Sequence, residues 1–428
     1  MLDIRLIREK PDFVKERIAT RGGDAAIAVS MLVDEILACD TLRRSLETQL
    51  QKLNGERKQK SKEIGMLRGK GEDTSAIEAQ VRAAGEDIAR LNQETTEAEA
   101  RQRDLLLQLP NLPHANAPIG ADAEANPVVR MWGEKPTIAD PRSHLEIGAE
   151  LGLFDLERAA RMSGSAFACY TGAGARLERA LINFMLDLHS REHGYTEVSP
   201  PFIVRAEALV GTGQLPKFEE QLYRCERDDL YLAPTAEVPV TNLHREEILA
   251  PAELPKKYVA YTPCFRREAG SAGLGTRGLI RVHQFDKVEL VKLALPETSY
   301  DELESLTANA ERVLQLLGLH YRVIELCTGD LGFGGAKTYD IEVWAPGQNG
   351  YLEVSSCTNF EDFQARRLSL RFKDAEGKNR FCHTLNGSGT ALPRIYVALL
   401  ETYRQPDGSV LIPEALRGHF GAEKIAKP

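Results

Sequence analysis

The feature that most constrains the fold of this chain is a seven-residue apolar repeat between Leu46 and Leu105. Apolar residues recur at spacings of three and four on both sides of a short polar segment, at positions 46, 50, 53, 64 and 67 and then at 77, 81, 84, 88 and 91. This period is typical of two-stranded coiled coils. The polar segment, residues 68–75, contains two glycines, and Asp73 or Thr74 is suited to cap the helix that follows. The repeat therefore predicts an antiparallel helical hairpin with its tip near residues 68–75.

Charge is distributed unevenly along this hairpin. Residues 43–70 carry nine basic and three acidic side chains, a local net charge of +6, whereas the whole chain is −9. Two interpretations remain open: a solvated helix face, or a surface that follows the phosphates of a nucleic acid. The candidate nucleic-acid contacts are Arg43, Arg44, Lys52, Arg57, Lys58, Lys60 and Lys62. Because Arg57 and Lys60 also fall on the apolar seam, we expect the middle of the hairpin to be narrow and partly solvated.

A proline-rich linker follows the hairpin, at residues 109–120. Its prolines at 110, 113 and 118 exclude a helix or a central strand. We therefore predict a helical arm over residues 1–110 and a second domain over residues 111–428. In that second domain, short β-branched and aromatic runs alternate with amphipathic helices. This mixture predicts an α+β fold built on a largely antiparallel β-sheet flanked by helices.

Several protein classes are disfavoured by the sequence. The first fourteen residues mix apolar and charged side chains, unlike a signal peptide, and no run of about 18 apolar residues could span a membrane. The seven cysteines are widely spaced and form no C-x-x-C pair, and no H-E-x-x-H is present. This pattern argues against a disulfide framework or a zinc site and favours a reducing, cytoplasmic location.

Three segments of the second domain carry candidate chemistry. Residues 261–291 read as two strand-like runs around a glycine-rich loop that begins at Arg266, Arg267 and Glu268. An arginine fork on a strand end suits phosphate and carboxylate oxygens, although a surface ion-pair network is the alternative. Residues 175–201 predict a helix, a short strand and a proline, and residues 386–404 predict a glycine-rich strand, Arg394 and a helix. The run GDLGFGG at 329–335 fits neither phosphate-loop spacing, so we interpret it as a tight connection.

Together these three segments resemble the three signatures of class II aminoacyl-tRNA synthetases. Four further strings are similar to the seryl branch of that family: GTGQLPKF (211–218), TAEVPVTN (235–242), KTYDIEVW with EVSSCTNF (337–344 and 353–360), and HTLNGSG (383–389). The basic hairpin matches the tRNA-binding arm of bacterial seryl-tRNA synthetases, so the resemblance covers nearly the whole chain. It implies that serine is activated with ATP to seryl-adenylate and then transferred to tRNA(Ser), and also to tRNA(Sec).

The resemblance also implies roles for individual residues. The serine-binding residues would be Thr235, Ala236, Glu237, Arg266, Glu289 and Ser388. The ATP-binding residues would be Arg266, Arg267, Glu268, Arg281, Val282, Phe285, Glu353, Val354, Ser355, Ser356 and Arg394. Arg266 and Arg394 would be catalytic, and Glu353 with Ser356 would hold Mg²⁺. Simpler interpretations remain: Glu237 as a solvated helix start, Glu353 as an outward strand residue, Ser356 as a turn residue and Phe285 as core.

The resemblance finally implies a homodimer, with tRNA bound across both subunits, and no membrane. Three rival functions are weighed against it. A synthetase-like ligase that loads a carrier protein would lack the long arm. A catalytically silent RNA-binding protein would be expected to have lost Arg266, Glu289, Glu353 or Arg394, all of which are present. A structural coiled-coil protein would not need the second domain.

Overall fold

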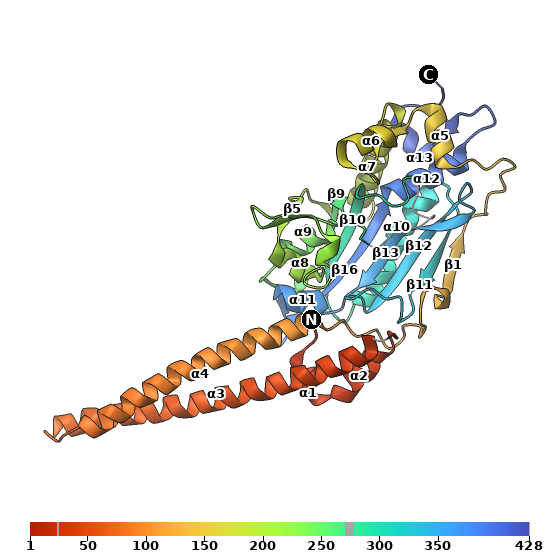
Figure 1. The fold of residues 1–428 in the computed structure, drawn as a ribbon. Coiled ribbons are helices and arrows are strands. Elements are labelled where there is room, and N and C mark those ends of the chain that lie inside the picture. Colours follow the sequence, from red (N-terminus) through yellow and green to blue (C-terminus); the bar gives the residue numbers. More distant parts are fainter. Residues whose placement is uncertain (24, 270–277, 428) are drawn as a thin grey trace. The chain divides into compact units, whose positions relative to one another are not determined.

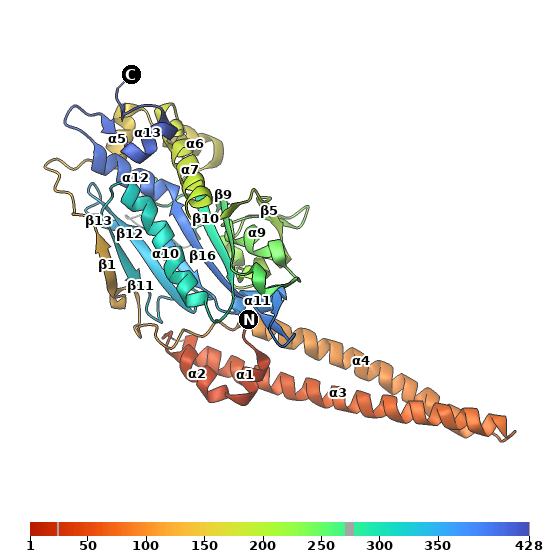
Figure 2. The same ribbon diagram turned by 180° about the vertical axis from the view of Figure 1, so that it is seen from behind.

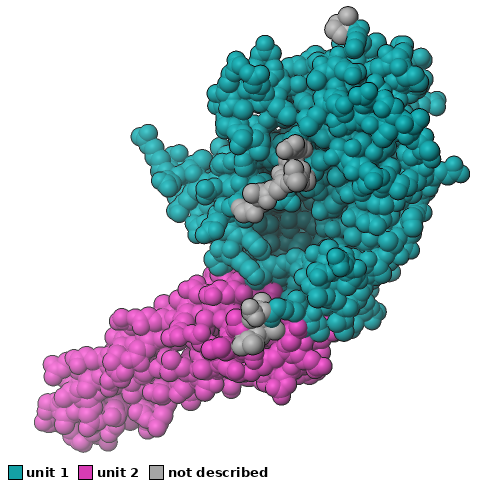
Figure 3. Space-filling model, turned by 45° about the vertical axis from the view of Figure 1, so that its right-hand side comes forward, with its two compact units in different colours: residues 1, 20–23, 111–428 teal, residues 2–19, 24–110 magenta. Residues whose placement is uncertain are grey.

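The computed structural model describes residues 1–23, 25–269 and 278–427. The chain divides into two compact units, which Figure 3 colours separately. Unit 2 comprises residues 2–19 and 24–110, and unit 1 comprises Met1, residues 20–23 and residues 111–428. Residues 270–277 of the second signature lie outside the described residues. Among the described residues, no helix is long and apolar enough to cross a membrane.

Unit 2 is entirely helical, and its two long helices run side by side in opposite directions (Figure 1). These helices are α3 (Ala25–Gly69) and α4 (Ser75–Gln108), and two short helices precede them, α1 (Ile4–Glu9) and α2 (Pro11–Ala19). Along the seam, Leu46 packs against Leu91 and Ala98, with Leu50 and Leu53 beside them. The predicted antiparallel hairpin is therefore confirmed. Arg57 is exposed and Lys60 is half-buried, as expected for a narrow, solvated middle.

The tip of the hairpin turns where the sequence places its glycines. Gly71 has a φ of +76°, a conformation that a side chain would disfavour. The amide of Glu72 donates to the carbonyl of Leu67, which closes the end of α3. Thr74 is the N-cap of α4 but makes no side-chain cap bond, whereas the Asp73 carboxylate accepts from the amide of Ser75 at 3.0 Å. Of the two predicted caps, Asp73 is therefore the one that accepts a hydrogen bond from a backbone amide at the start of α4.

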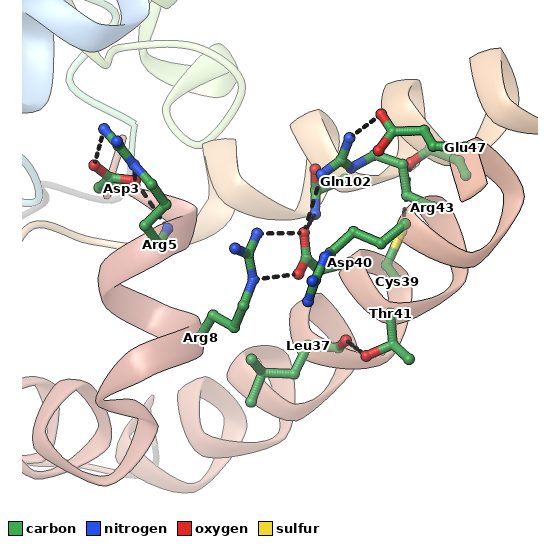
Figure 4. A network of polar contacts seen from close by, with 12 residues as sticks. Asp3, Arg5, Arg8, Leu37, Cys39, Asp40, Thr41, Arg43, Glu47 and Gln102 are labelled. Atoms are coloured by element: carbon green, nitrogen blue, oxygen red, sulfur yellow. Dashed lines mark hydrogen bonds and ion pairs between the residues drawn. The ribbon is translucent and has the colours of Figure 1, made fainter. Parts of the chain in front are cut away.

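A buried carboxylate ties three helices of unit 2 together (Figure 4). Asp40 of α3 is 2% exposed. It accepts hydrogen bonds from Arg8 of α1 at 2.7 and 3.1 Å, from Gln102 of α4 at 3.0 Å and from Arg43 at 3.3 Å. Burial raises the pKa of Asp40, but these hydrogen bonds outweigh burial and leave the pKa below its usual value. Asp40 thus fixes the register of α1, α3 and α4.

Unit 1 is built on one eight-stranded sheet. Its strand order is β1-β11-β12-β13-β16-β10-β9-β4, and every pairing is antiparallel except that of β4 with β9. The strands are β1 (Val128–Trp132), β4 (Thr196–Glu197), β9 (Lys256–Phe265), β10 (Gln284–Ala294), β11 (Tyr321–Glu325), β12 (Lys337–Ala345), β13 (Gly350–Asn359) and β16 (His383–Ala391). The predicted α+β fold with a largely antiparallel sheet is confirmed.

Three helices cover one face of this sheet: α7 (Ala173–Arg191), α10 (Ser299–Leu316) and α12 (Leu392–Tyr403). Figure 2 shows α7 and α10 in front of the strands. Because strand side chains alternate between faces, Val288 and Leu290 of β10 point into the apolar core with these helices. Phe285, Lys287 and Glu289 consequently point to the opposite face, where the candidate site lies.

The remaining elements surround the sheet. The helices are α5 (His144–Leu151), α6 (Leu156–Ser163), α8 (Ala206–Thr212), α9 (Glu237–Thr241), α11 (Phe363–Leu368) and α13 (Glu414–Phe420). The short strands are β2 (Phe154–Asp155), β3 (Cys169–Tyr170), β5 (Ile203–Arg205), β6 (Arg224–Cys225), β7 (Leu230–Leu232), β8 (Ile248–Leu249), β14 (Arg371–Lys373), β15 (Asn379–Phe381), β17 (Val410–Leu411) and β18 (Lys424–Ile425). Figure 1 shows α8, α9 and β5 gathered beside β9 and β10.

Candidate active site

A cavity of about 710 Å³ opens on the face of the sheet that the three helices leave uncovered. It is lined by residues of β10, β13 and β16, by the start of α9 and of α12, and by the chain on either side of residues 270–277. The predicted site residues that line it are Thr235, Glu237, Arg266, Glu268, Arg281, Val282, Phe285, Glu289, Glu353, Val354, Ser356, Ser388 and Arg394. Side chains up to 159 positions apart in the sequence thus meet in one cavity.

Three predicted residues do not line the cavity. Ala236 is fully buried in a small core with Val240 and Val291. The amide of Arg267 donates to the carbonyl of Gln221. Ser355 is buried, and its hydroxyl donates to the carbonyl of Ser388 at 2.6 Å, so it supports a cavity residue from behind.

One end of the cavity holds two buried carboxylates, Glu237 and Glu289. Burial, followed by the nearby charge of Glu289, raises the pKa of Glu237 to about 7. The amide nitrogen of Gln364 in α11 donates to Glu237 at 2.6 Å, and the hydroxyl of Thr384 donates to Gln364 at 2.6 Å. This chain of hydrogen bonds fixes the Glu237 carboxylate at the first residue of α9. The expectation that Glu237 is a solvated helix start therefore does not hold.

Glu289 faces Ser388 across two neighbouring strands. The two residues are register partners in the β10–β16 pair, where a bulge between Val288 and Glu289 shifts the ladder. The hydroxyl of Thr235 lies 3.4 Å from a carboxylate oxygen of Glu289. These polar groups could hydrogen-bond a substrate hydroxyl, whereas a methyl group in the same place would offer them no hydrogen bond.

The other end of the cavity holds cations. Arg266 follows β9, and its guanidinium lies 5.1 Å from the ring centre of Phe285 while its Nε donates to the carbonyl of Pro234. Arg281 donates to Glu268 at 2.7 Å, and Glu268 has a φ of +49°, an uncommon conformation for a residue other than glycine. Such cations and an aromatic face can hold a nucleotide's phosphates and base.

Arg394, in the first turn of α12, reaches back over the sheet. Its Nη1 donates to the backbone carbonyl of Glu353 at 2.6 Å and lies 3.6 Å from the Glu353 carboxylate. Its Nε donates to the carbonyl of Ile280. Because one guanidinium bridges β13 and the segment before β10, Arg394 is held in the cavity lining beside Glu353.

The donors around Glu353 suit a hard cation. Ser356 lies on the same strand, and Asp340 is its register partner on β12. One carboxylate oxygen of Asp340 is buried without a hydrogen-bond partner, and burial, with the neighbouring Glu353, raises the pKa of Asp340. Carboxylate and hydroxyl oxygens are the ligands that Mg²⁺ prefers, and it usually takes only one or two carboxylates beside substrate phosphates. The residues present therefore fit Mg²⁺.

Two features of the cavity were missed by the sequence reasoning. Lys287 lines it between Phe285 and Glu289, and the loop at residues 332–335 forms a wall. Arg21 holds that loop with hydrogen bonds of 2.9–3.2 Å to the carbonyls of Leu331, Gly332 and Gly335, and also to that of Asn111. The glycines of GDLGFGG signalled a tight connection, but no pattern linked it to Arg21.

On unit 2, the seven predicted nucleic-acid contacts differ in their surroundings. Arg44, Lys52, Arg57, Lys58 and Lys62 are exposed, and Lys60 is half-buried. Arg43 is 18% exposed, and its guanidinium pairs with both Asp40 and Glu47. The exposed side chains are the ones available to phosphates, whereas Arg43 already serves the Asp40 network.

The chain matches two described families. Residues 1–113 match the seryl-tRNA synthetase N-terminal domain, and residues 220–403 match the tRNA synthetase class II core domain (G, H, P, S and T). The chain is 62% identical to a serine–tRNA ligase of Akkermansia muciniphila over 99% of both chains. It is 53% identical to a serine–tRNA ligase of Syntrophobacter fumaroxidans over 98% of this chain and 99% of the relative.

Solved structures resemble the whole chain as well. Seryl-tRNA synthetase from Pyrococcus horikoshii, complexed with ATP, is 39% identical and covers 100% of both chains with a TM-score of 0.93. A complex of A. aeolicus tRNASec with M. kandleri SerRS has a TM-score of 0.58 over 82% of this chain and 71% of that one. At 19% identity, this second likeness shows the fold alone.

Proposed function

Because the chain belongs to the seryl-tRNA synthetase family, and so is an ATP-dependent serine–tRNA ligase, we propose that the cavity of unit 1 is its active site. The enzyme activates serine with ATP and transfers it to tRNA(Ser). One observation carries the assignment of the site: Glu289 faces Ser388 across β10 and β16, in the same cavity as Glu237 and Arg266.

Serine occupies the carboxylate end of the cavity. Its ammonium group binds Glu237, with Thr235 closing that side and Ala236 buried behind it, and its hydroxyl donates to Glu289 and lies beside Ser388. Support comes from the burial of both carboxylates and from the hydrogen bonds that fix Glu237 and Glu289. Alanine is rejected because it offers no hydroxyl to hydrogen-bond with Glu289 and Ser388, and threonine because its additional methyl group finds no room.

ATP occupies the cationic end. Arg266 bridges the serine carboxylate and the α-phosphate, so a carboxylate oxygen attacks phosphorus in line and diphosphate leaves. Glu268 holds the adenine amino group, Phe285 stacks on the adenine, and Arg281 and Arg394 bind the γ-phosphate. Val282 and Val354 complete the lining of the ATP site, whereas Arg267 and Ser355 lie behind it and act as supports. No protein base is needed, since the attacking carboxylate is already ionised.

Glu353 and Ser356 would hold Mg²⁺, with Asp340 behind them. The ion would supply charge neutralisation for the phosphates. Support comes from the oxygen donors that β12 and β13 bring together and from the unpaired carboxylate oxygen of Asp340.

In the second step, the 3′-terminal ribose hydroxyl of the tRNA attacks the acyl carbon of seryl-adenylate, and AMP leaves. The basic face of α3 binds the tRNA through its backbone phosphates. Arg44, Lys52, Arg57, Lys58, Lys60 and Lys62 are the proposed contacts, and Arg43 acts mainly through Asp40. The same surface accepts tRNA(Sec), a tRNA bound by the M. kandleri enzyme of the same fold.

The enzyme acts as a homodimer in the cytoplasm, with one tRNA contacting both subunits. The helix α7 and β4 belong to the first signature, which forms the subunit interface in this family. The seven cysteines, all free in the structure, agree with a reducing compartment.

The test of the site is serine transfer by two arginine variants. Arg266→Gln should lower the rate of tRNA(Ser) charging by roughly 10²–10³-fold, the usual loss when a donor to transition-state charge is removed. Arg224→Gln is the matched control, because Arg224 is half-exposed, pairs with Asp229 and does not line the cavity. Equal activity of the two variants would contradict the assigned role of Arg266.

A further inference from the structure

Lys287 is a buried cation in the cavity wall that has no role in the reaction proposed above. It lies on β10 between Phe285 and Glu289, on the face that lines the cavity, and is 6% exposed. A buried lysine is costly unless it is paired, and a strand position offers many apolar residues that would fill the same space. Its presence in the cavity wall therefore calls for a specific role.

The ammonium group of Lys287 is held by the residues proposed to bind serine. Nζ donates to the hydroxyl of Thr235 at 2.9 Å and forms an ion pair with the carboxylate of Glu289. Thr235 in turn lies 3.4 Å from the same carboxylate oxygen of Glu289. These three side chains form a closed triangle, so the direction of the Glu289 carboxylate depends on Lys287.

The charges that face this pocket balance only when Lys287 is counted. Glu237 and Glu289 contribute two carboxylates, and Arg266 and Lys287 contribute two cations. Cys264 of β9 is also close, but burial raises the pKa of its thiol, which stays neutral. Without Lys287, two buried carboxylates would face one cation. Burial and the nearby charge of Glu289 raise the pKa of Glu237 and the charge of Lys287 lowers it, so the loss of Lys287 would raise that pKa further.

We propose that Lys287 is a positioning residue for serine specificity: its ammonium group pairs with the Glu289 carboxylate and orients it, so that Glu289 accepts the hydrogen bond of the substrate hydroxyl. The proposal rests on the assigned role of Glu289 in binding serine. Lys287 does not touch the reacting carboxylate or phosphate. Lys287 acts on the substrate through Glu289, which it orients. Its positive charge also acts on the neighbouring Glu237 carboxylate.

The same strand supplies a matched control. Lys292 is also buried and pairs with a carboxylate, Glu302, at 2.7 Å. Its side chain points to the opposite face of the sheet, toward α10, where it also contacts Ser305. Replacing Lys292 by methionine removes a buried charge of the same kind from the same strand, but leaves the cavity untouched.

The test compares Lys287→Met with Lys292→Met in serine-dependent ATP–pyrophosphate exchange, measured from pH 6 to 9. For Lys287→Met, the KM for serine at neutral pH should rise about tenfold or more, while the KM for ATP stays within about twofold. The pH above which serine binds well should move up by roughly one unit, because the positive charge that lowers the pKa of Glu237 is then lost. Lys292→Met should keep the wild-type pH profile. Equal shifts in both variants, or equal rises in both KM values, would overturn the proposal.

A double variant keeps the proposal testable if Lys287→Met does not fold. In Lys287→Met/Glu289→Gln neither partner is left charged and unpaired. Its pH profile should return to that of the wild type, and its preference for serine over alanine should fall by at least tenfold. A profile displaced from that of the wild type by roughly one pH unit, or an unchanged preference for serine over alanine, would contradict the role of Lys287. Absence of serine-dependent exchange in the wild type would instead refute the proposed site.

Discussion

The basic face of α3 gives a prediction whose size follows from the structure. Arg44, Lys52, Lys58 and Lys62 are all exposed. At 3.6 residues per turn they fall within an arc of about 120° on one side of the helix, so one nucleic-acid strand or duplex can contact all four. We expect the fourfold variant, with glutamine at each position, to lose tRNA affinity without losing the helix, because glutamine has a similar helix propensity.

The magnitude follows from counterion release. Each phosphate that a cation neutralises contributes roughly 0.7–0.9 to the slope of log Kd against log salt, so four contacts contribute about 3. At about 0.1 M salt, a slope change of 3 corresponds to an affinity loss of roughly 10³-fold, and two contacts would give between tenfold and a hundredfold. The assay is tRNA(Ser) binding over a salt series. Serine-dependent ATP–pyrophosphate exchange should stay unchanged, because unit 1 carries the cavity.

The facing helix supplies the control. On α4, Arg82, Arg90, Arg101 and Arg103 are exposed, but seven acidic residues accompany them. Arg90 and Arg101 already pair with carboxylates. Replacing these four arginines by glutamine should leave the salt slope within about one of the wild-type value. An unchanged slope in the α3 variant, or equal changes in both variants, would refute the assignment of the α3 face to tRNA phosphates.

Three further predictions concern single residues. Glu353→Gln should raise the Mg²⁺ concentration that gives half-maximal exchange by roughly tenfold or more, because a carboxylate ligand is lost. Glu342→Gln, on neighbouring β12, should not raise it. Equal effects of the two variants would count against the metal site. The KM for serine should fall as pH rises through about 7, because the raised pKa of Glu237 keeps its carboxyl group protonated below that pH and only the ionised form attracts the ammonium group. The KM of Glu237→Gln should lack this pH dependence. A wild-type KM that rises with pH would contradict the role of Glu237. Asp40→Ala should speed amide hydrogen exchange in α1 by roughly 30-fold, because it removes hydrogen bonds to a buried charge, and these bonds contribute about 2 kcal/mol. Glu47→Ala is the control, because the pair of Glu47 with Arg43 is partly exposed. It should change the exchange rate less than about threefold.

The sequence predicts the parts of this molecule whose signals are local. A heptad pattern specifies the α3–α4 hairpin because each seam residue lies one turn from the next. Alternating β-branched residues likewise predict β11 and β12. The segment Leu279–Phe285 shows the limit of such patterns: it reads as a strand, yet β10 begins only at Gln284, because the preceding residues carry Val282 and Arg281 to the cavity wall.

Partners that are distant in the sequence could not be predicted. Gln364 fixes Glu237 from 127 positions away, and nothing near Gln364 signals that contact. In the sequence, Lys287 looks like an ordinary strand lysine. Only the structure shows that it pairs with Glu289 and donates a hydrogen bond to Thr235. Arg43 has the charge of a phosphate contact, but only the packing of α1 and α4 against α3 shows that Asp40 engages it. Such pairings depend on tertiary packing, which a local pattern does not encode.

The central claim is that the carboxylate end of the cavity selects serine. ATP–pyrophosphate exchange with each of the twenty amino acids tests it most directly, because the cavity lies in unit 1 and exchange reports serine activation without tRNA. We expect exchange with serine to exceed exchange with alanine by roughly 10⁴-fold, as in sites that hydrogen-bond a substrate hydroxyl, and to exceed that with threonine as well. Exchange that is absent with serine, or faster with another amino acid, would contradict the account.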